Sequence, residues 1–208
     1  ACAPFRRLSL CKKNMEKIAT SSTKHDLLLD VCLAAKYEGD SLKHYSEKLN
    51  VTYTDSPSQL CTELARSFAD IGDIVRGRDL YRGGGRGRKQ LEENLQKIFG
   101  NIYDKLLEEN RTNGKKSALQ ARYNDATGNY YQLREDWWNA NRATLWEAMT
   151  CDAPYDAQYF RGTCGSGNNA KRAPSQCRCE KKSGEPQDQV PTYFDYVPRS
   201  VRWFEEWA

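Results

Sequence analysis

The sequence predicts an all-α domain whose irregular segments are held by disulfides. Apolar residues recur at steps of three and four over several long stretches, which is the period of an amphipathic helix. Aromatic residues make up 11% of the 208 residues, enough to build a core although 29% of residues are charged. The eight cysteines are an even number at irregular spacings. We therefore expect a disulfide-stabilised helical bundle with long irregular cysteine-pinned loops.

The cysteines form two groups, one in the first third of the chain and one in the last third. They are Cys2, Cys11, Cys32 and Cys61, then Cys151, Cys164, Cys177 and Cys179. We expect all eight to form disulfides, and Cys177 and Cys179 to face opposite ways towards different partners. Eight cysteines allow 105 connectivities, and nine remain if pairing stays within the groups. Because disulfides persist in oxidising compartments, an extracellular protein is favoured.

A zinc site is the alternative for the second cysteine group. Zinc sites usually contain two pairs of cysteines separated by two to four residues, because that turn points both sulfurs at one metal. Here the first two spacings are long, and a single residue separates Cys177 from Cys179. Disulfides are therefore favoured over a metal, and we expect no cofactor.

The first helices are predicted from apolar spacing and start signals. Residues 1–24 are irregular and basic, residues 25–37 are helical, and the apolar pattern resumes after Gly39. Ser56 and Pro57 combine a capping residue with proline at the first helical position. The helix that starts there ends near Gly77, and its apolar stripe consists of Leu60, Leu64, Phe68, Ile71 and Val75.

Two more long helices and one short helix complete the prediction. Residues 77–88 are glycine-rich and form a loop, and residues 89–110 form the next helix. A polar loop over 111–117 precedes a helix over 129–150, on which Tyr131, Trp138, Leu145 and Met149 share a face. The final helix begins near Pro198, and we expect the tryptophans to be core anchors.

The domain organisation is expected to have two parts. Residues 1–56 form an N-terminal subdomain, and residues 57–208 form a helical-bundle subdomain with a cysteine-rich loop over 151–191. That loop shows no periodicity, and we expect no strands and no internal repeat in the chain. No apolar run approaches the roughly 20 residues that span a bilayer. Both ends resemble cuts in a longer protein, so we expect a fragment.

Basic side chains in the predicted loops are the candidate binding residues. Guanidinium groups bind sulfate or phosphate through paired hydrogen bonds, and loops carry recognition more often than helices. Ordinary solvated surface is the alternative for each of them. The candidates are Arg82, Arg86, Arg88, Lys89, Lys115, Lys116, Lys171, Arg172, Lys181 and Lys182. The glycine-rich loop is not a P-loop, because no Lys-Ser/Thr follows at the required spacing.

Catalysis has no support in the sequence, so we expect no enzyme. Neither histidine lies in a catalytic or zinc-binding motif, and no nucleophile signature is present. The acidic residues near the end of the helix that stops near Gly77 have arginines at helical spacing. Arg66–Asp70 and Asp73–Arg76 are therefore expected to be structural ion pairs. The net charge of +4 does not by itself predict a nucleic-acid partner.

Several long stretches, in order along the chain, carry a family resemblance. Residues 2–7 read CAPFRR, 28–39 read LLDVCLAAKYEG, and 65–79 read ARSFADIGDIVRGRD. Residues 137–151 read WWNANRATLWEAMTC, and residues 190–207 contain VPTYFDYVP and RWFEEW. Together they resemble the Duffy-binding-like domain, alpha class, of malarial erythrocyte membrane protein 1 antigens.

The resemblance implies an exported, antigenically variable adhesin on the infected red cell. It implies an α-helical fold of three subdomains, of which this chain resembles the first two. Alpha-class members are linked to rosetting and some to heparan-sulfate-type binding. The resemblance implies partners such as host red-cell or endothelial receptors, heparan-sulfate-type or blood-group glycans, and antibodies. If the resemblance holds, the quoted motifs form the scaffold of the domain, and the irregular loops between them form the variable recognition surface. A structural spacer or immune decoy whose neighbours carry the binding is the alternative.

Overall fold

The computed structural model describes residues 2–50, 59–79, 81, 85–111, 114–165, 167–180 and 189–207. They divide into two compact units. Unit 1 contains residues 1–11, 32–71 and 142–208, and unit 2 contains residues 12–31 and 72–141. These units are not the subdomains 1–56 and 57–208 of the sequence analysis, so that division stays a prediction.

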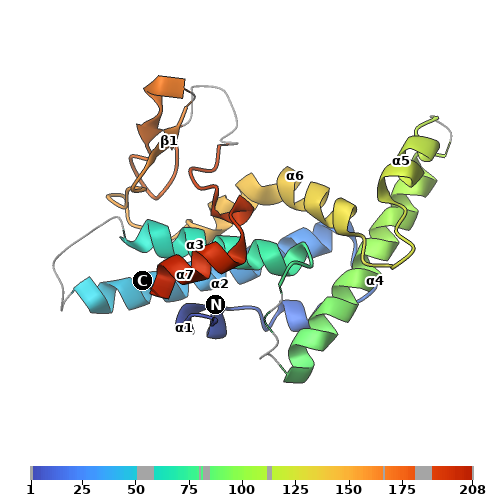
Figure 1. Cartoon of the computed structure of the whole chain (residues 1–208), viewed down its shortest axis with the longest axis horizontal. Helices are drawn as coiled ribbons and strands as arrows, with labels where there is room; N and C mark the ends of the chain where they lie inside the picture. Colours follow the sequence, from blue (N-terminus) through green and yellow to red (C-terminus); the bar gives the residue numbers. More distant parts are fainter. Residues whose placement is uncertain are drawn as a thin grey trace. The chain divides into compact units, whose positions relative to one another are not determined.

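The described chain is mostly helical, as predicted, and Figure 1 shows its elements. In chain order they are α1 (Phe5–Leu8), the 3-10 turn η1 (Met15–Lys17), α2 (Lys24–Asn50), α3 (Gln59–Val75), α4 (Gly85–Glu109), α5 (Lys116–Tyr123), α6 (Tyr131–Met149), β1 (Gly162–Cys164), η2 (Gly167–Asn169), β2 (Lys171–Arg172), η3 (Phe194–Tyr196) and α7 (Arg199–Trp207). None of the described helices is long and apolar enough to cross a membrane.

Helices α2 and α3 follow from their apolar residues. The whole predicted stripe of α3, from Leu60 to Val75, is buried. Helix α2 continues through Gly39 without a break. A Cβ at Gly39 would collide with the backbone oxygen of Met149, so this glycine is needed for close packing and does not end the helix. The predicted start signal at Ser56 and Pro57 lies outside the described residues.

Helix α4 begins four residues earlier than predicted. The glycines of the preceding loop favoured irregular structure, yet Gly85 and Gly87 are helical. A Cβ at Gly87 would lie 2.9 Å from the carboxylate of Glu16, so the glycine permits a close approach of η1 to α4 within unit 2. Packing therefore outweighs the helix propensity of glycine here.

Two small elements contradict the predicted loops. Helix α5 starts at Lys116, inside the stretch predicted as a loop, and packs beside α4 (Figure 1). Strands β1 and β2 pair antiparallel in the cysteine-rich segment, where no strand was expected. Both elements are too short for their apolar spacing to produce a pattern.

Four of the five tryptophans are core residues, as predicted. Trp137, Trp138, Trp146 and Trp203 are at most 9% exposed, whereas Trp207 is 52% exposed. Tyr131 is also half exposed, although its spacing placed it with buried Trp138. It is the first residue of α6, where the helix has no preceding turn to cover the ring.

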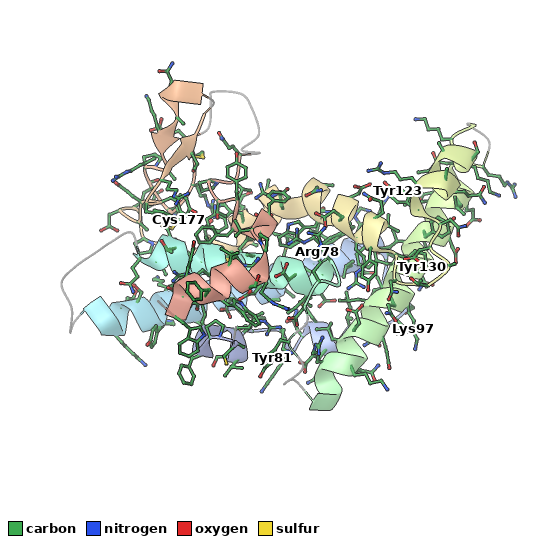
Figure 2. All side chains as sticks on the ribbon, in the orientation of Figure 1. Arg78, Tyr81, Lys97, Tyr123, Tyr130 and Cys177 are labelled. Atoms are coloured by element: carbon green, nitrogen blue, oxygen red, sulfur yellow. A yellow bond between two sulfur atoms is a disulfide. The ribbon has the colours of Figure 1, made fainter. Side chains whose placement is uncertain are left out.

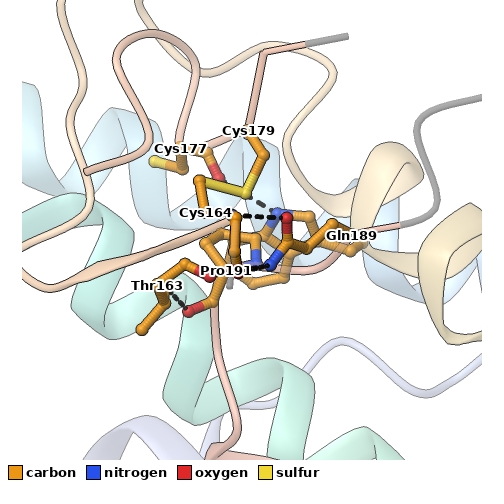
Figure 3. Close-up of a disulfide and its surroundings, with 8 residues drawn as sticks. Thr163, Cys164, Cys177, Cys179, Gln189 and Pro191 are labelled. Atoms are coloured by element: carbon orange, nitrogen blue, oxygen red, sulfur yellow. Dashed lines mark hydrogen bonds between the residues drawn. A yellow bond between two sulfur atoms is a disulfide. The ribbon is translucent and has the colours of Figure 1, made fainter. Parts of the chain in front are cut away.

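Two disulfides hold the cysteine-rich segment of unit 1. Cys61 of α3 pairs with Cys177, and Cys164 of β1 pairs with Cys179. As expected, Cys177 and Cys179 have different partners. Because Cys61 and Cys177 come from different groups, pairing does not stay within the groups. Figure 3 shows the second disulfide beside Gln189, whose amide donates to the backbone oxygen of Thr163 over 2.8 Å.

The structure corrects the expectation that all eight cysteines pair. Cys2, Cys11, Cys32 and Cys151 are free thiols in it, because none has another sulfur at bonding distance. Burial and the neighbouring Glu38 carboxylate raise the pKa of Cys11 to about 11. Burial also raises the pKa of Cys32. The zinc alternative is excluded for the second group, because Cys164, Cys177 and Cys179 are already in disulfides.

A buried ionic network joins α1, α3 and α7 within unit 1. Arg6 donates to Asp70 over 2.8 Å and to Glu206 over 2.9 and 3.0 Å. Arg202 donates to the second oxygen of Asp70 over 3.0 Å. The predicted Arg66–Asp70 pair is therefore wrong, and Arg66 pairs with Glu63. These contacts fix α7 against α3 (Figure 1).

In unit 2, a buried arginine stabilises the end of α3. Arg134 of α6 is fully buried and donates to the backbone oxygens of Ile74 and Val75 in the last turn of α3, where the Ile74 oxygen also accepts from the N–H of Gly77 over 3.1 Å. Its guanidinium also binds both carboxylate oxygens of Glu92 over 2.6 and 3.0 Å. The predicted Asp73–Arg76 ion pair is present at 3.1 Å.

Candidate functional site

The candidate basic residues lie in both units. Arg88 and Lys89 belong to the first turn of α4, and Lys115 and Lys116 lie at the start of α5, all in unit 2. Lys171 and Arg172 form strand β2 in unit 1 and are exposed. Arg82, Lys181 and Lys182 lie outside the described residues, and the side chain of Arg86 is not described either.

The unit 2 candidates do not form one patch. Arg88 and Lys89 lie at the start of α4, whereas Lys115 and Lys116 follow its end. A helix rises about 1.5 Å per residue, so the roughly 20 intervening helical residues separate the two pairs by about 30 Å. Two separate cationic positions result, and only a long polyanion could contact both together.

The side chain of Lys89 is 82% exposed, whereas that of the neighbouring Arg88 is 29% exposed. The Lys89 ammonium lies 3.7 Å from Glu93 one turn later, which is a surface ion pair of little energetic weight. Lys97, further along α4, is an exposed lysine that the sequence analysis missed (Figure 2). Its helical position hid it, because only loop residues were considered as candidates.

Arg88, in contrast, is partly engaged in holding the chain. Its guanidinium donates to the backbone oxygen of Asp79 over 2.6 Å and lies 3.8 Å from that residue's carboxylate. The same carboxylate accepts a hydrogen bond from the backbone N–H of Tyr81 over 3.2 Å. Arg88 therefore anchors the segment before α4, and its charge is not fully available to a ligand.

Arg88 also lines a pocket of about 230 Å³ in unit 2. The pocket contains the amide pair Gln96–Asn129, joined by a 2.8 Å hydrogen bond, and the half-exposed ring of Tyr131. Lys12 also lines the pocket and lies 3.1 Å from Glu16. Gly77 forms part of the wall at φ +73°, where a Cβ would meet Tyr131 and Arg134.

The pocket has balanced charge and offers hydrogen bonds and one aromatic surface. Arg88 faces Asp79 and Lys12 faces Glu16, so both cations of the lining have a carboxylate beside them. The sequence analysis missed Lys12, Gln96, Asn129 and Tyr131. They come from three separate stretches of the chain, around residues 12, 96 and 129–131, and no local spacing connects these stretches.

The turn before α6 positions Asn129. Asp125 accepts hydrogen bonds from the hydroxyl and backbone N–H of Thr127 and from the backbone N–H of Tyr130. These bonds hold the pKa of the Asp125 carboxyl below its usual value. Figure 2 labels Tyr123, the last residue of α5, and Tyr130, which lies in the turn directly before α6. Within the described residues, no group of His, Cys, Asp and Glu could hold a metal ion.

The comparisons with known proteins agree with this fold. The model of the family described as "Duffy binding domain" matches residues 1–202. The chain is 39% identical to the NTS-DBL1(alpha-1) domain of the Plasmodium falciparum membrane protein 1 (PfEMP1) from the varO strain, with a TM-score of 0.74. That match covers 100% of this chain and 43% of the solved chain.

Two further relatives carry receptor names in their descriptions. The solved ICAM-1-binding PfEMP1 IT4var13 DBLbeta domain is 32% identical with a TM-score of 0.68, over 99% of this chain and 42% of that one. The Duffy receptor beta form of Plasmodium knowlesi is 28% identical over 71% of this chain, which spans only 11% of that protein. The chain belongs to the Duffy binding domain family, whose members are adhesion domains and not enzymes.

Proposed function

We propose that this chain is part of an alpha-class extracellular adhesion domain, exposed on the infected red cell, that binds sulfated glycans on host cells. Blood-group glycans and protein receptors are further partners under this proposal. Its main support is the exposed Lys89 at the start of α4, which follows Arg82, Arg86 and Arg88 in the sequence. The names of two relatives, which mention ICAM-1 and the Duffy receptor, agree with a receptor-binding role.

The physical basis is multivalent electrostatic attraction. A sulfated polysaccharide carries regularly spaced anions, and a chain of them can contact cationic positions about 30 Å apart along α4. Each contact releases counterions, so affinity falls steeply as salt rises. No covalent chemistry is involved, and binding and release are governed by charge and shape.

Heparin chromatography of the oxidised chain tests this proposal. We expect the variant R82Q/R86Q/R88Q/K89Q to elute at clearly lower salt than the natural sequence, because four cations are lost together. Since Arg88 also anchors Asp79, the variant R82Q/R86Q/K89Q separates charge loss from a local structural change. This triple variant should still elute at lower salt than the natural sequence, with most of the shift seen for the quadruple variant.

The matched control neutralises four exposed lysines outside the candidate segments, in the variant K13Q/K17Q/K36Q/K48Q. It changes the net charge by the same amount, so it should reduce retention less if the predicted loop binds. Equal elution of the control and the quadruple variant would reject a specific role for residues 82–89.

A structural spacer or immune decoy is the second candidate function. It is supported by the engagement of Arg88 with Asp79 and by the separation of the basic positions at opposite ends of α4. A glycan array and a red-cell binding assay with the oxidised chain distinguish the two functions. Absence of binding in both assays would favour the spacer.

A further inference from the structure

The β1–β2 hairpin of unit 1 brings three cationic residues together (Figure 1). Gly162 of β1 pairs with Arg172 of β2, and Cys164 pairs with Lys171. Arg161 directly precedes Gly162, so its backbone lies close to that of Arg172, because paired residues of neighbouring strands have Cα atoms about 5 Å apart. Arg161, Lys171 and Arg172 are all exposed. The sequence analysis missed Arg161, because only the strand pairing brings it to the other two.

These three cations have no carboxylate beside them. Within the part of the chain that the structure describes, Arg161, Lys171 and Arg172 form no ion pair within 4.0 Å. The guanidinium of Arg161 instead lies 5.2 Å from the centre of the Phe160 ring, a contact made by its flat face and not by its N–H groups. The segment 158–180 contains one acidic residue, Glu180. A ligand at the hairpin therefore does not have to displace an existing ion pair.

Arg178, in the same segment, shows the opposite arrangement. Its guanidinium donates to the hydroxyl of Thr150 over 2.7 Å and to the backbone oxygen of Glu147 over 2.6 Å. It also lies 3.6 Å from the Glu147 carboxylate, and its side chain is only 18% exposed. Arg178 thus holds the cysteine-rich segment against the end of α6. No comparable ion pair accounts for the three exposed cations.

The hairpin holds these cations in defined positions. The Cys164–Cys179 disulfide links β1 to the segment that follows β2. The side-chain amide of Gln189 donates to the backbone oxygens of Thr163 and Gly165 over 2.8 and 3.1 Å, and its oxygen accepts from the N–H of Gly165 over 2.8 Å (Figure 3). Because the backbone is already ordered, a ligand that binds here loses little affinity to the ordering of the protein.

We propose that the β1–β2 hairpin binds a short sulfated segment of a host glycan through Arg161, Lys171 and Arg172. This inference rests on the proposed function, since it names a site in unit 1 for the same class of ligand. Guanidinium groups bind sulfate through paired hydrogen bonds, and lysine adds a point charge. Three neighbouring cations can contact adjacent sulfates of one short chain, whereas the basic positions at the two ends of α4, about 30 Å apart, need a long one.

The test is an NMR titration of the oxidised, ¹⁵N-labelled chain with a heparin tetrasaccharide. We expect the largest amide shifts at residues 161–164 and 171–172, and no shifts with a fully desulfated tetrasaccharide. The variant R161Q/K171Q/R172Q should bind the tetrasaccharide at least several-fold more weakly. The matched control K13Q/K36Q/K48Q loses the same charge from exposed lysines outside the hairpin and should change binding much less.

A second variant changes the hairpin without changing its charge. A Cβ at Gly162 would lie 2.9 Å from the backbone oxygen of Ala170, so G162A forces the two strands apart. It should weaken tetrasaccharide binding although all three cations remain. The control G100A adds the same methyl group on α4, where the nearest atoms belong to the Tyr130 side chain at 3.4 Å, and should leave binding unchanged.

The outcomes separate this inference from the proposed function. If the natural sequence were neither retained on heparin nor shifted by the tetrasaccharide, the proposed function would be rejected as well. Retention on heparin with tetrasaccharide shifts confined to residues 82–89 would overturn only the hairpin site. Equal weakening by R161Q/K171Q/R172Q and K13Q/K36Q/K48Q would also overturn it, because net charge alone would then explain binding.

Discussion

The two units stabilise their irregular parts by different means. All eight cysteines lie in unit 1, and the segments of unit 2, residues 12–31 and 72–141, contain none. In unit 1 two disulfides hold a segment with little regular secondary structure. In unit 2 buried arginines and side-chain-to-backbone hydrogen bonds hold the turns between helices. Cross-links are therefore present where regular backbone hydrogen bonding is sparse, and polar networks suffice where helices supply most of the core.

Removal of the disulfides should have the largest effect and should be confined to unit 1. Cys61–Cys177 spans 116 residues and Cys164–Cys179 spans 15. In the chain-entropy description, the longer loop contributes about 5 kcal/mol and the shorter about 3 kcal/mol. We expect C61A/C177A to lose more free energy of unfolding than C164A/C179A in urea denaturation.

Hydrogen exchange on the two variants locates the effect. Protection should fall in the cysteine-rich segment and remain in α4 and α5, which belong to unit 2. Equal losses for both double variants would contradict the loop-length argument. Loss of protection throughout α4 would show that unit 2 also depends on the disulfides.

Truncation of Arg134 should have the next largest effect and should destabilise unit 2. R134A leaves the Glu92 carboxylate and the last carbonyls of α3 without their buried donor. Because the Glu92 side chain is itself 38% exposed, the main cost is that of buried carbonyl oxygens left without their donor, about 1–3 kcal/mol for each such group, which urea unfolding measures.

The matched control is R122A, because Arg122 also binds a carboxylate, that of Asp136, through two hydrogen bonds but is 55% exposed. Exposed pairs contribute about 1 kcal/mol or less. Similar losses in the free energy of unfolding for R134A and R122A would contradict the idea that Arg134 stabilises unit 2 because it is buried.

Substitution of Asp125 should have the smallest effect, and that effect should appear as a pH dependence of the free energy of unfolding. The hydrogen bonds donated by Thr127 and Tyr130 lower its pKa in the folded state. The folded protein then binds fewer protons than the unfolded chain, so this stabilisation is present above about pH 4 and is lost as pH falls through the lowered pKa. D125N should be less stable than the natural sequence at pH 6, and the difference should shrink near pH 3. An unshifted carboxyl titration in NMR would contradict this.

Sequence reasoning predicted the long helices because their apolar stripes are continuous. The buried residues of α3, from Leu60 to Val75, repeat the helical period over four turns. Sequence reasoning failed at Gly39 and Gly87, because at each position the glycine allows another segment to pack closely against the helix. It also failed at Tyr131 and Trp207, whose exposure depends on what lies beside the helix ends and not on their spacing.

The candidate site was predicted less well than the fold. Arg88 and Lys89 were identified from local composition, and the structure places both at the start of α4. That Arg88 is engaged with Asp79 could not be predicted, because the contact depends on how the preceding segment turns back. The pocket residues Lys12 and Asn129 are more than one hundred positions apart in the sequence, so nothing local links them.

By itself, the sequence determined the helical class, the positions of the long helices and the family, because periodicity and motifs are local properties. It also determined which cysteines were available. Only the tertiary structure decided that Cys61 pairs with Cys177, that Arg6 and Arg202 share Asp70, and that the apolar face of α7 points outwards. Each of these depends on the distance in space between groups far apart in the chain, and that distance is set by packing.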